Sequence, residues 1–118
     1  MFRIGIIGAG WIAHKMTLAL GYTDEACVYA IASRSEDKAR SFAEEHGIPM
    51  AYGSYEAMLD DPEVDLVYIA TPHSHHFAHA MLALEHGKPV LVEKAFTANA
   101  NEAKILIDTA RNKGLFIT

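Results

Sequence analysis

Short apolar runs alternate with longer amphipathic stretches along the whole chain. Four runs are nearly continuous in apolar side chains and rich in Val, Ile and Tyr: residues 2–7, 27–32, 65–70 and 89–93. Runs of this kind are typical of buried parallel strands, because helices cover both faces of a parallel sheet. Two weaker strand candidates are also present, at residues 49–52 and 115–118.

The stretches between these runs carry the signals of helices that begin at a cap and end at a glycine. Three such helices are predicted, over residues 35–47, 74–87 and 101–114, and a fourth follows the glycines near the N-terminus. Ser35 and Ser74 stand where N-caps are expected, and Asn99 and Glu102 have the spacing of a capping box. The alternation predicts a single α/β domain with a doubly wound parallel sheet, strand order 3-2-1-4-5-6.

The composition is that of a soluble globular protein and argues against some partners. The 118 residues are 51% hydrophobic and 21% charged, with a formal net charge of −5. This acidic balance disfavours nucleic acid or an anionic membrane as a partner. The one cysteine, Cys27, cannot form an internal disulfide, and the sequence shows neither a signal-peptide pattern nor an apolar run long enough to span a bilayer. We therefore expect a cytoplasmic protein.

The stretch "GIIGAGWIA" places a glycine-rich turn directly after the first strand. Gly8, Gly10 and Ala13 match the pattern G-x-G-x-x-G/A between a strand and a helix, which is typical of a Rossmann dinucleotide site. We expect Gly8 to make the turn, Gly10 to let a pyrophosphate approach the backbone, and Ala13 to let the helix pack closely. Trp11 and Ile12 begin the helix whose free N–H groups would face the phosphates. The alternative is a glycine turn without a ligand.

The end of the second strand indicates which dinucleotide would bind. Ser33 and Arg34 stand there, where an NAD site usually has a carboxylate, and the first acid, Glu36, already belongs to the next helix. A guanidinium can hold a 2′-phosphate that a carboxylate would repel. We therefore expect NADP, with NAD as the alternative, in which case Arg34 would stack on the adenine.

Polar residues follow two more strands at the same sheet edge. In a doubly wound sheet, ligands bind outside the carboxyl ends of the strands, where the strand order reverses. The candidates there are Thr71, Pro72, His73 and His76 after the fourth strand, and Glu93 and Lys94 after the fifth. The ammonium of Lys94 can polarise a substrate oxygen or exchange a proton, which makes it the candidate catalytic residue. Glu93 could hold a ribose hydroxyl or orient Lys94, and the alternative is an exposed ion pair.

Four histidines occur within "HSHHFAH". His75 and His79 lie four residues apart on one helix face, as metal ligands can, but no acid or cysteine nearby completes a set. We therefore expect no metal site, and we expect His73 and His76 to line the cofactor cleft. The sequence shows no arrangement of a Ser or Cys nucleophile with a base of the kind that hydrolases use, so a hydrolase has little support.

The segments "GIIGAGWIA", "ASR" and "ATPHSHHFAHAMLALEHGKPVLVEKAFTANANEA" together resemble the N-terminal domain of the Gfo/Idh/MocA oxidoreductases, in particular their dihydrodiol dehydrogenase branch. The resemblance covers essentially the whole chain. It implies hydride transfer between NAD(P) and a small-molecule sugar, polyol or related alcohol. It also implies that Lys94 lies beside the nicotinamide and the substrate hydroxyl, and that Glu93 contacts the nicotinamide ribose. Thr71, Pro72 and His73 would line the nicotinamide end, and His76 matches a recurring histidine.

Two departures from the family pattern matter. The family usually has Glu-Lys-Pro where this chain has Glu-Lys-Ala, so we expect a trans peptide bond before Ala95. Members also continue into a C-terminal substrate domain, which residues 1–118 do not include. We expect this truncated domain to bind the cofactor without turnover, and to self-associate as a homo-oligomer through surface that the second domain would cover.

Two other classes of function are alternatives to an oxidoreductase. A non-catalytic regulatory module would bind the nucleotide without needing Lys94 at its nicotinamide end. A methyltransferase-like domain would bind S-adenosylmethionine, but it usually has an acid where this chain has Ser33 and Arg34.

Overall fold

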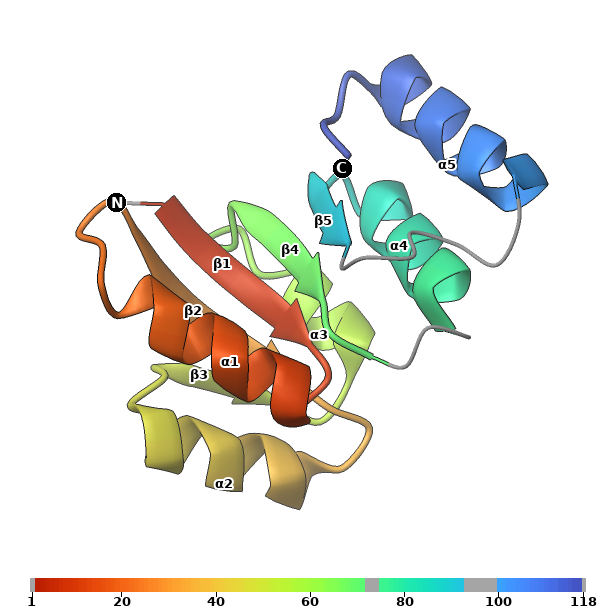
Figure 1. The fold of residues 1–118 in the computed structure, drawn as a ribbon. Coiled ribbons are helices and arrows are strands. Elements are labelled where there is room, and N and C mark those ends of the chain that lie inside the picture. Colours follow the sequence, from red (N-terminus) through yellow and green to blue (C-terminus); the bar gives the residue numbers. More distant parts are fainter. Residues whose placement is uncertain (1, 72–74, 93–99, 118) are drawn as a thin grey trace.

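A computed structural model describes residues 2–71, 75–92 and 100–117 of the chain (Figure 1). The elements are, in order, β1 (Phe2–Ile7), α1 (Trp11–Leu20), β2 (Ala26–Ala32), α2 (Glu36–His46), β3 (Met50–Tyr52), α3 (Tyr55–Leu59), β4 (Leu66–Ile69), α4 (His76–Glu85), β5 (Val90–Val92) and α5 (Ala100–Lys113). The strands form one parallel sheet of order β3-β2-β1-β4-β5. The predicted doubly wound α/β fold is confirmed.

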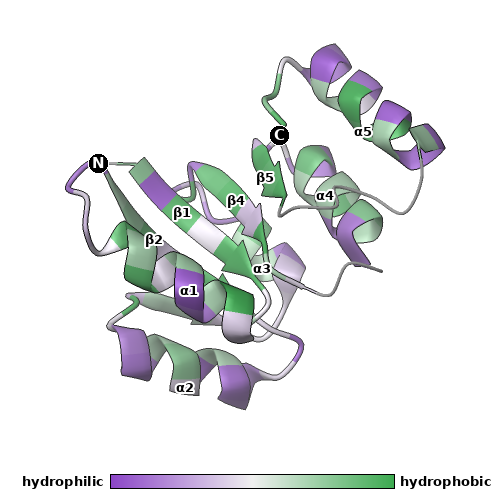
Figure 2. Cartoon of the chain, viewed as in Figure 1, coloured by the Kyte–Doolittle hydropathy of each residue, from purple (hydrophilic) through white to green (hydrophobic). Residues whose placement is uncertain are grey.

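Alternating side chains of the strands supply a core on each face of the sheet. Ile6 and Ile31 pack with α1 and α2 on one face, whereas Ile7 and Val67 pack with α3, α4 and α5 on the other. All four side chains are fully buried. Figure 2 shows hydrophobic residues along β4 and β5 and hydrophilic ones on α2 and α5. Both faces of the sheet are therefore covered, which explains why the strands are nearly continuous in apolarity.

The ends of α2 follow the predicted local chemistry. The Ser35 hydroxyl accepts a hydrogen bond from the Lys38 N–H at 3.3 Å, and Gly47 adopts a left-handed conformation with φ +69°. Both predicted caps are confirmed. The prediction for the next helix is wrong, because the N-cap of α4 is His75 and not Ser74, and no side chain caps this helix. Asn99 lies outside the described residues, so the capping box predicted there stays a prediction.

The structure differs from expectation at two further places. Residues 115–117 make only a single parallel bridge, between Ile117 and Val90, with the Val90 N–H donating to the Phe116 carbonyl at 2.9 Å. The expected sixth strand is therefore not formed in the described residues, because one bridge does not make a ladder. The short helix α3 was not predicted. Its N-cap is Ser54, whose hydroxyl accepts from the Ala57 N–H at 3.3 Å.

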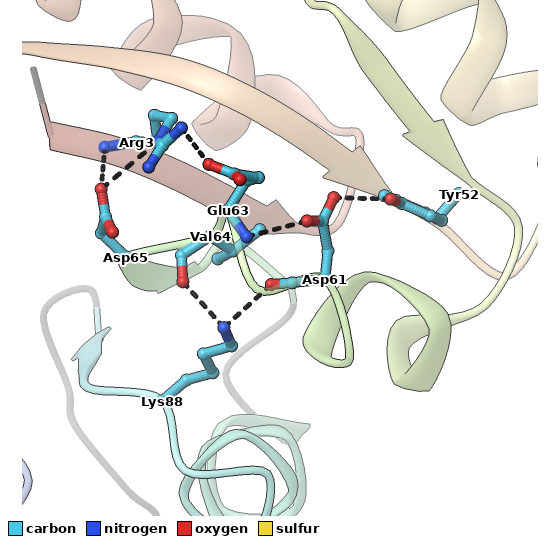
Figure 3. A network of polar contacts seen from close by, with 7 residues as sticks. All are labelled: Arg3, Tyr52, Asp61, Glu63, Val64, Asp65 and Lys88. Atoms are coloured by element: carbon cyan, nitrogen blue, oxygen red, sulfur yellow. Dashed lines mark hydrogen bonds and ion pairs between the residues drawn. The ribbon is translucent and has the colours of Figure 1, made fainter.

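A polar network ties the loop before β4 to its surroundings (Figure 3). The Lys88 ammonium donates to the carbonyls of Asp61 at 2.9 Å and Val64 at 2.8 Å. The Tyr52 hydroxyl donates to the Asp61 carboxylate at 2.7 Å. This network joins β3, the end of α3 and the start of β5, and it holds α3 against the sheet.

None of the helices in the described part of the chain is long and apolar enough to cross a membrane.

Candidate nucleotide-binding site

The glycine loop between β1 and α1 is built around a left-handed residue. Gly8 has a φ of +103°, a backbone conformation that residues with a Cβ rarely adopt. Its N–H donates to the Ala32 carbonyl at 2.8 Å, which ties the loop to the end of β2. A Cβ at this position would lie 2.9 Å from Cγ2 of Thr71, at the end of β4. Gly8 therefore lets three strand ends meet closely.

Gly10 leaves the N-terminus of α1 open. It is the N-cap residue, with extended backbone, and no side chain caps this helix. A Cβ added to Gly10 would meet no atom within 4 Å. The first N–H groups of α1 thus face free space, together with the positive end of the helix dipole. This cradle fits a phosphate group, because an anion can approach the backbone without a steric obstacle.

The first turn of α1 presents large side chains to solvent. Trp11 is 71% exposed and Ile12 39% exposed, whereas Ala13 is fully buried against the sheet. The indole ring of Trp11 stacks on the imidazole of His14, with the ring centroids 5.4 Å apart. Trp11 therefore borders the phosphate cradle, and its fluorescence can report on what binds there.

The end of β2 offers a cation and no carboxylate. Ser33 is buried, and its hydroxyl accepts from the Ser35 N–H at 3.3 Å, so this side chain shapes the turn into α2. Arg34 is exposed and lines a small cleft beside Thr71. Glu36 begins α2 and pairs with Arg40 at 3.1 Å. The end of β2 thus presents a guanidinium, and no carboxylate of the described residues, to this cleft.

The cleft is completed by side chains from α3 and α4. It has a volume of about 120 Å³ and is lined by Arg34, Tyr55, Thr71, His75 and His79. The rings of Tyr55 and His79 meet edge to face at 4.8 Å, and those of His75 and His79 stack at 5.5 Å. Aromatic rings and a guanidinium that line one cleft can contact a planar base by stacking and by cation–π interaction.

Hydrogen bonds to Thr71 organise two histidines of α4, the buried His76 and the half-buried His79. The Nε2–H of His76, a side chain only 3% exposed, donates to the Thr71 carbonyl at 2.9 Å. Nδ1 of His79 lies 2.7 Å from the Thr71 hydroxyl. Burial lowers the pKa of His79, and the positive charges of His75 and Arg34 lower it further. His79 is therefore a neutral hydrogen-bonding group at neutral pH, and His76 is bonded to the backbone at Thr71.

All eight predicted site residues that lie in the described part of the chain are at this one edge of the sheet. They are Gly8, Gly10, Trp11, Ile12, Ser33, Arg34, Thr71 and His76. Pro72, His73, Glu93 and Lys94 lie outside the described residues, as does the peptide bond before Ala95. Tyr55 is not among the residues predicted from sequence, and His79 is there only as one of two histidines that lack further metal ligands. The four-residue spacing of His75 and His79 was the available signal, but it says nothing about Arg34 opposite.

This fold with this edge defines a dinucleotide-binding domain, and comparison with known proteins places it in a family. Residues 2–118 match the model of the Gfo/Idh/MocA proteins, described as an oxidoreductase family with an NAD-binding Rossmann fold. The chain belongs to this family and is its NAD(P)-binding oxidoreductase domain.

The relatives are dehydrogenases and reductases much longer than this chain. Trans-1,2-dihydrobenzene-1,2-diol dehydrogenase of Bos taurus is 43% identical over 116 residues, which are 97% of this chain and 35% of that protein. The NADP(+)-dependent D-xylose 1-dehydrogenase of Hypocrea jecorina is 61% identical over 66 residues, 56% of this chain and 17% of that protein. The chain thus spans about 35% of the length of the dihydrodiol dehydrogenases that it matches.

A solved structure shares the fold closely. KijD10, a 3-ketoreductase from Actinomadura kijaniata in complex with NADP, is 37% identical, with a TM-score of 0.92 over 98% of this chain and 37% of that one. The predicted family and its dihydrodiol dehydrogenase-like branch agree with these similarities.

Proposed function

We propose that this chain is the NADP-binding part of an oxidoreductase that transfers hydride to or from a sugar, polyol or related alcohol or carbonyl compound. The observation that carries the proposal is the uncapped N-terminus of α1 behind Gly8 and Gly10, facing open space. The pyrophosphate would lie on these N–H groups, because the helix dipole and the bare backbone both favour an anion there.

NADP rather than NAD follows from the residues at the end of β2. Arg34 is exposed at the cleft and can pair with a 2′-phosphate, and no carboxylate of the described residues lines that cleft. The NADP complex of KijD10 and the NADP(+)-dependent xylose dehydrogenase support this choice by similarity. The alternative is NAD, with Arg34 stacked on the adenine and Tyr55 and His79 beneath it.

The nicotinamide end is proposed from the family resemblance. Bound nicotinamide would supply or accept the hydride. Lys94 would hold the proton that leaves or joins the substrate oxygen, and Glu93 would contact the ribose. Thr71, Pro72 and His73 would line the ring. Since His76 anchors the Thr71 carbonyl at 2.9 Å, it would position this wall without itself reacting.

Residues 1–118 are proposed to bind the cofactor without turning substrate over. The dihydrodiol dehydrogenases that they match are about three times as long, with 35% of their length covered. Hydride transfer needs a closed site that excludes water and orients the substrate, and one wall of a sheet edge does not provide this. A non-catalytic nucleotide-binding module is the second candidate, and turnover by a longer chain that contains Lys94 would exclude it.

The test of the cofactor proposal is a fluorescence titration with NADPH and with NADH, following Trp11, the only tryptophan. We expect saturable quenching that favours NADPH, and an at least tenfold loss of that preference in Arg34→Ala, because a paired 2′-phosphate contact is removed. Arg111→Ala, an exposed arginine on α5, is the matched control and should leave both titrations unchanged. Equal quenching by both nucleotides would reject the NADP preference, and no saturable quenching would reject the site.

A further inference from the structure

A second cluster of chemically active side chains lies where α1 meets the end of α2, on the helices shown together in Figure 1. His14 comes from α1, and Glu45 and His46 are the last two residues of α2. One ligand atom from each of the three residues lies within 4.8 Å of the other two. Among the described residues, this is the one group of three side chains whose ligand atoms lie close enough together to share a metal ion. None of the three is part of the candidate nucleotide site.

The separations of the donor atoms suit a transition metal. Nδ1 of His14 lies 3.0 Å from Nε2 of His46, and Oε2 of Glu45 lies 3.1 Å from the same nitrogen. In a tetrahedral zinc site with bonds of about 2.0–2.1 Å, neighbouring donors lie roughly 3.3 Å apart. Two imidazoles and one carboxylate are also a usual donor set for zinc, whereas calcium and magnesium prefer oxygen ligands only.

Packing holds the two histidine rings at this place. The side chain of His46 is only 6% exposed, and its ring lies against Phe42 at 4.4 Å and against His14 at 4.8 Å. The ring of His14 in turn stacks on the ring of Trp11, with the centroids 5.4 Å apart. Side chains locked by neighbouring rings lose little conformational entropy when they bind a ligand, so the site is largely preorganised.

The surrounding charge also favours a cation. His46 is the last residue of α2, where the helix dipole is negative, and no Lys or Arg stands in that last turn. Glu44 and Glu45 are both exposed there, so solvent reaches the carboxylate side of the cluster. An open fourth position could therefore be filled by water.

We propose that His14, Glu45 and His46 bind one Zn²⁺ ion, with water as the fourth ligand. The ion joins the first half of α1, which carries the phosphate cradle, to the far end of α2. The ion would link His14 to His46, which are 32 positions apart in the sequence. So wide a separation does not indicate a metal site from sequence alone. This site revises the expectation of no metal, and it does not depend on the proposed cofactor.

The test is a zinc titration of the full chain after treatment with a chelator, by calorimetry and by competition with a chromophoric zinc indicator. We expect one ion per chain, a rise in the melting temperature on binding, and an intense visible absorption of a four-coordinate site when Co²⁺ replaces Zn²⁺. Glu45→Gln and His14→Gln should each weaken binding at least about tenfold, because losing a direct ligand costs no less than losing a supporting one.

Two control variants change the same residue types, one next to the cluster and one far from it. Glu44→Gln removes the neighbouring carboxylate, and His86→Gln removes a histidine that pairs with Asp60 elsewhere. Both should bind zinc as the unmodified chain does. Glu45 is exposed, so Glu45→Gln should fold even if a change at the buried His46 does not.

Two outcomes would overturn the proposal. One is the absence of stoichiometric binding, in which case the histidines form only their hydrogen bond. The other is equal affinity in Glu45→Gln, His14→Gln and the controls, which would mean that the ion binds elsewhere. NADPH titration of Glu45→Gln separates the two sites, because a failed zinc site leaves nucleotide binding intact.

Discussion

At the scale of single residues, two neighbouring glycines have different physical roles. Gly8 needs a positive φ and lies against the end of β4, whereas Gly10 has extended backbone and free space around its Cα. Sequence alone shows both as members of one motif. The motif predicts a turn at Gly8 and a phosphate approach at Gly10, and the structure adds the positive φ and the contact with Thr71 at Gly8 and the open space beside Gly10.

This difference leads to a paired prediction. Gly8→Ala should lower the free energy of unfolding by about 1–3 kcal/mol, because of backbone strain and contact with Thr71. Gly10→Ala should cost less than about 1 kcal/mol, the usual N-cap difference, but should abolish NADPH quenching because its Cβ occupies the phosphate approach. Urea denaturation and the Trp11 titration measure the two effects. Equal destabilisation by both variants would contradict this assignment.

His79 gives a prediction on pH. Burial, and then the charges of His75 and Arg34, hold its pKa below the ordinary 6.5 in the folded chain. The unfolded chain therefore binds more protons as the pH falls below about 6.5, so the free energy of unfolding decreases there. Urea denaturation should show a smaller decrease in His79→Gln.

NMR titration of the His79 ring protons provides the independent check. We expect a pKa below 6.5, and a higher one in Arg34→Ala, because one repulsive charge is gone. A value at or above 6.5 in the unmodified chain would show that the ring is not buried beside Arg34 as described.

At the scale of elements, the contacts between segments decide what local signals leave open. The caps of α2 were predictable, because a cap depends on residues three or four positions apart. The sixth strand was not, because a strand needs a partner along its length, and residues 115–117 make one bridge only. The helix α3 was missed because its five residues are too few to show a period.

The hydrogen bond that joins β3 to the loop after α3 gives a second pH prediction. Burial and the Asp61 carboxylate raise the pKa of Tyr52 to about 12. Between pH 10 and 12 the folded chain keeps a proton that the unfolded chain has lost, so the free energy of unfolding falls as the pH rises. Tyr52→Phe should remove most of this dependence. Tyr22→Phe, at a tyrosine that is 94% exposed, is the control and should keep it.

The pKa of Asp61 determines how far the pH can fall before the stabilisation from the same hydrogen bond is lost. Burial raises its pKa, but hydrogen bonds from Tyr52, from the Glu63 backbone and from Tyr29 outweigh burial and leave the pKa below 3.8. The stabilisation is therefore present above about pH 3.8 and is lost as the pH falls through the lower folded value. Acid unfolding of Tyr52→Phe should begin at a higher pH than that of the unmodified chain.

At the scale of the whole molecule, the candidate binding groups lie together at one edge of the sheet. The glycine loop, Arg34 and the Thr71 turn all follow carboxyl ends of parallel strands, so the topology brings them together. All three loops belong to one domain, so they offer one wall of a binding site.

This leads to a prediction on turnover. Residues 1–118 should bind NADPH but show no oxidation or reduction of the nicotinamide with D-xylose or with a trans-dihydrodiol, the substrates named for its relatives. Absorbance at the nicotinamide band follows the reaction, and a longer chain containing residues 1–118 is the positive control. Turnover by the 118 residues alone would show that the edge is a complete active site.

The sequence by itself determined the parallel α/β fold, the order of its first five strands, the glycine loop and the cation at the end of β2. These follow from local periodicity and from single residues with special backbone or charge, which act over a few positions. The tertiary structure alone decided that Tyr55 and His79 share a cleft with Arg34, that His14 meets His46, and that residues 115–117 join β5 by one bridge only. These contacts depend on how the helices pack on the two faces of the sheet. That packing results from many contacts between segments distant in the sequence.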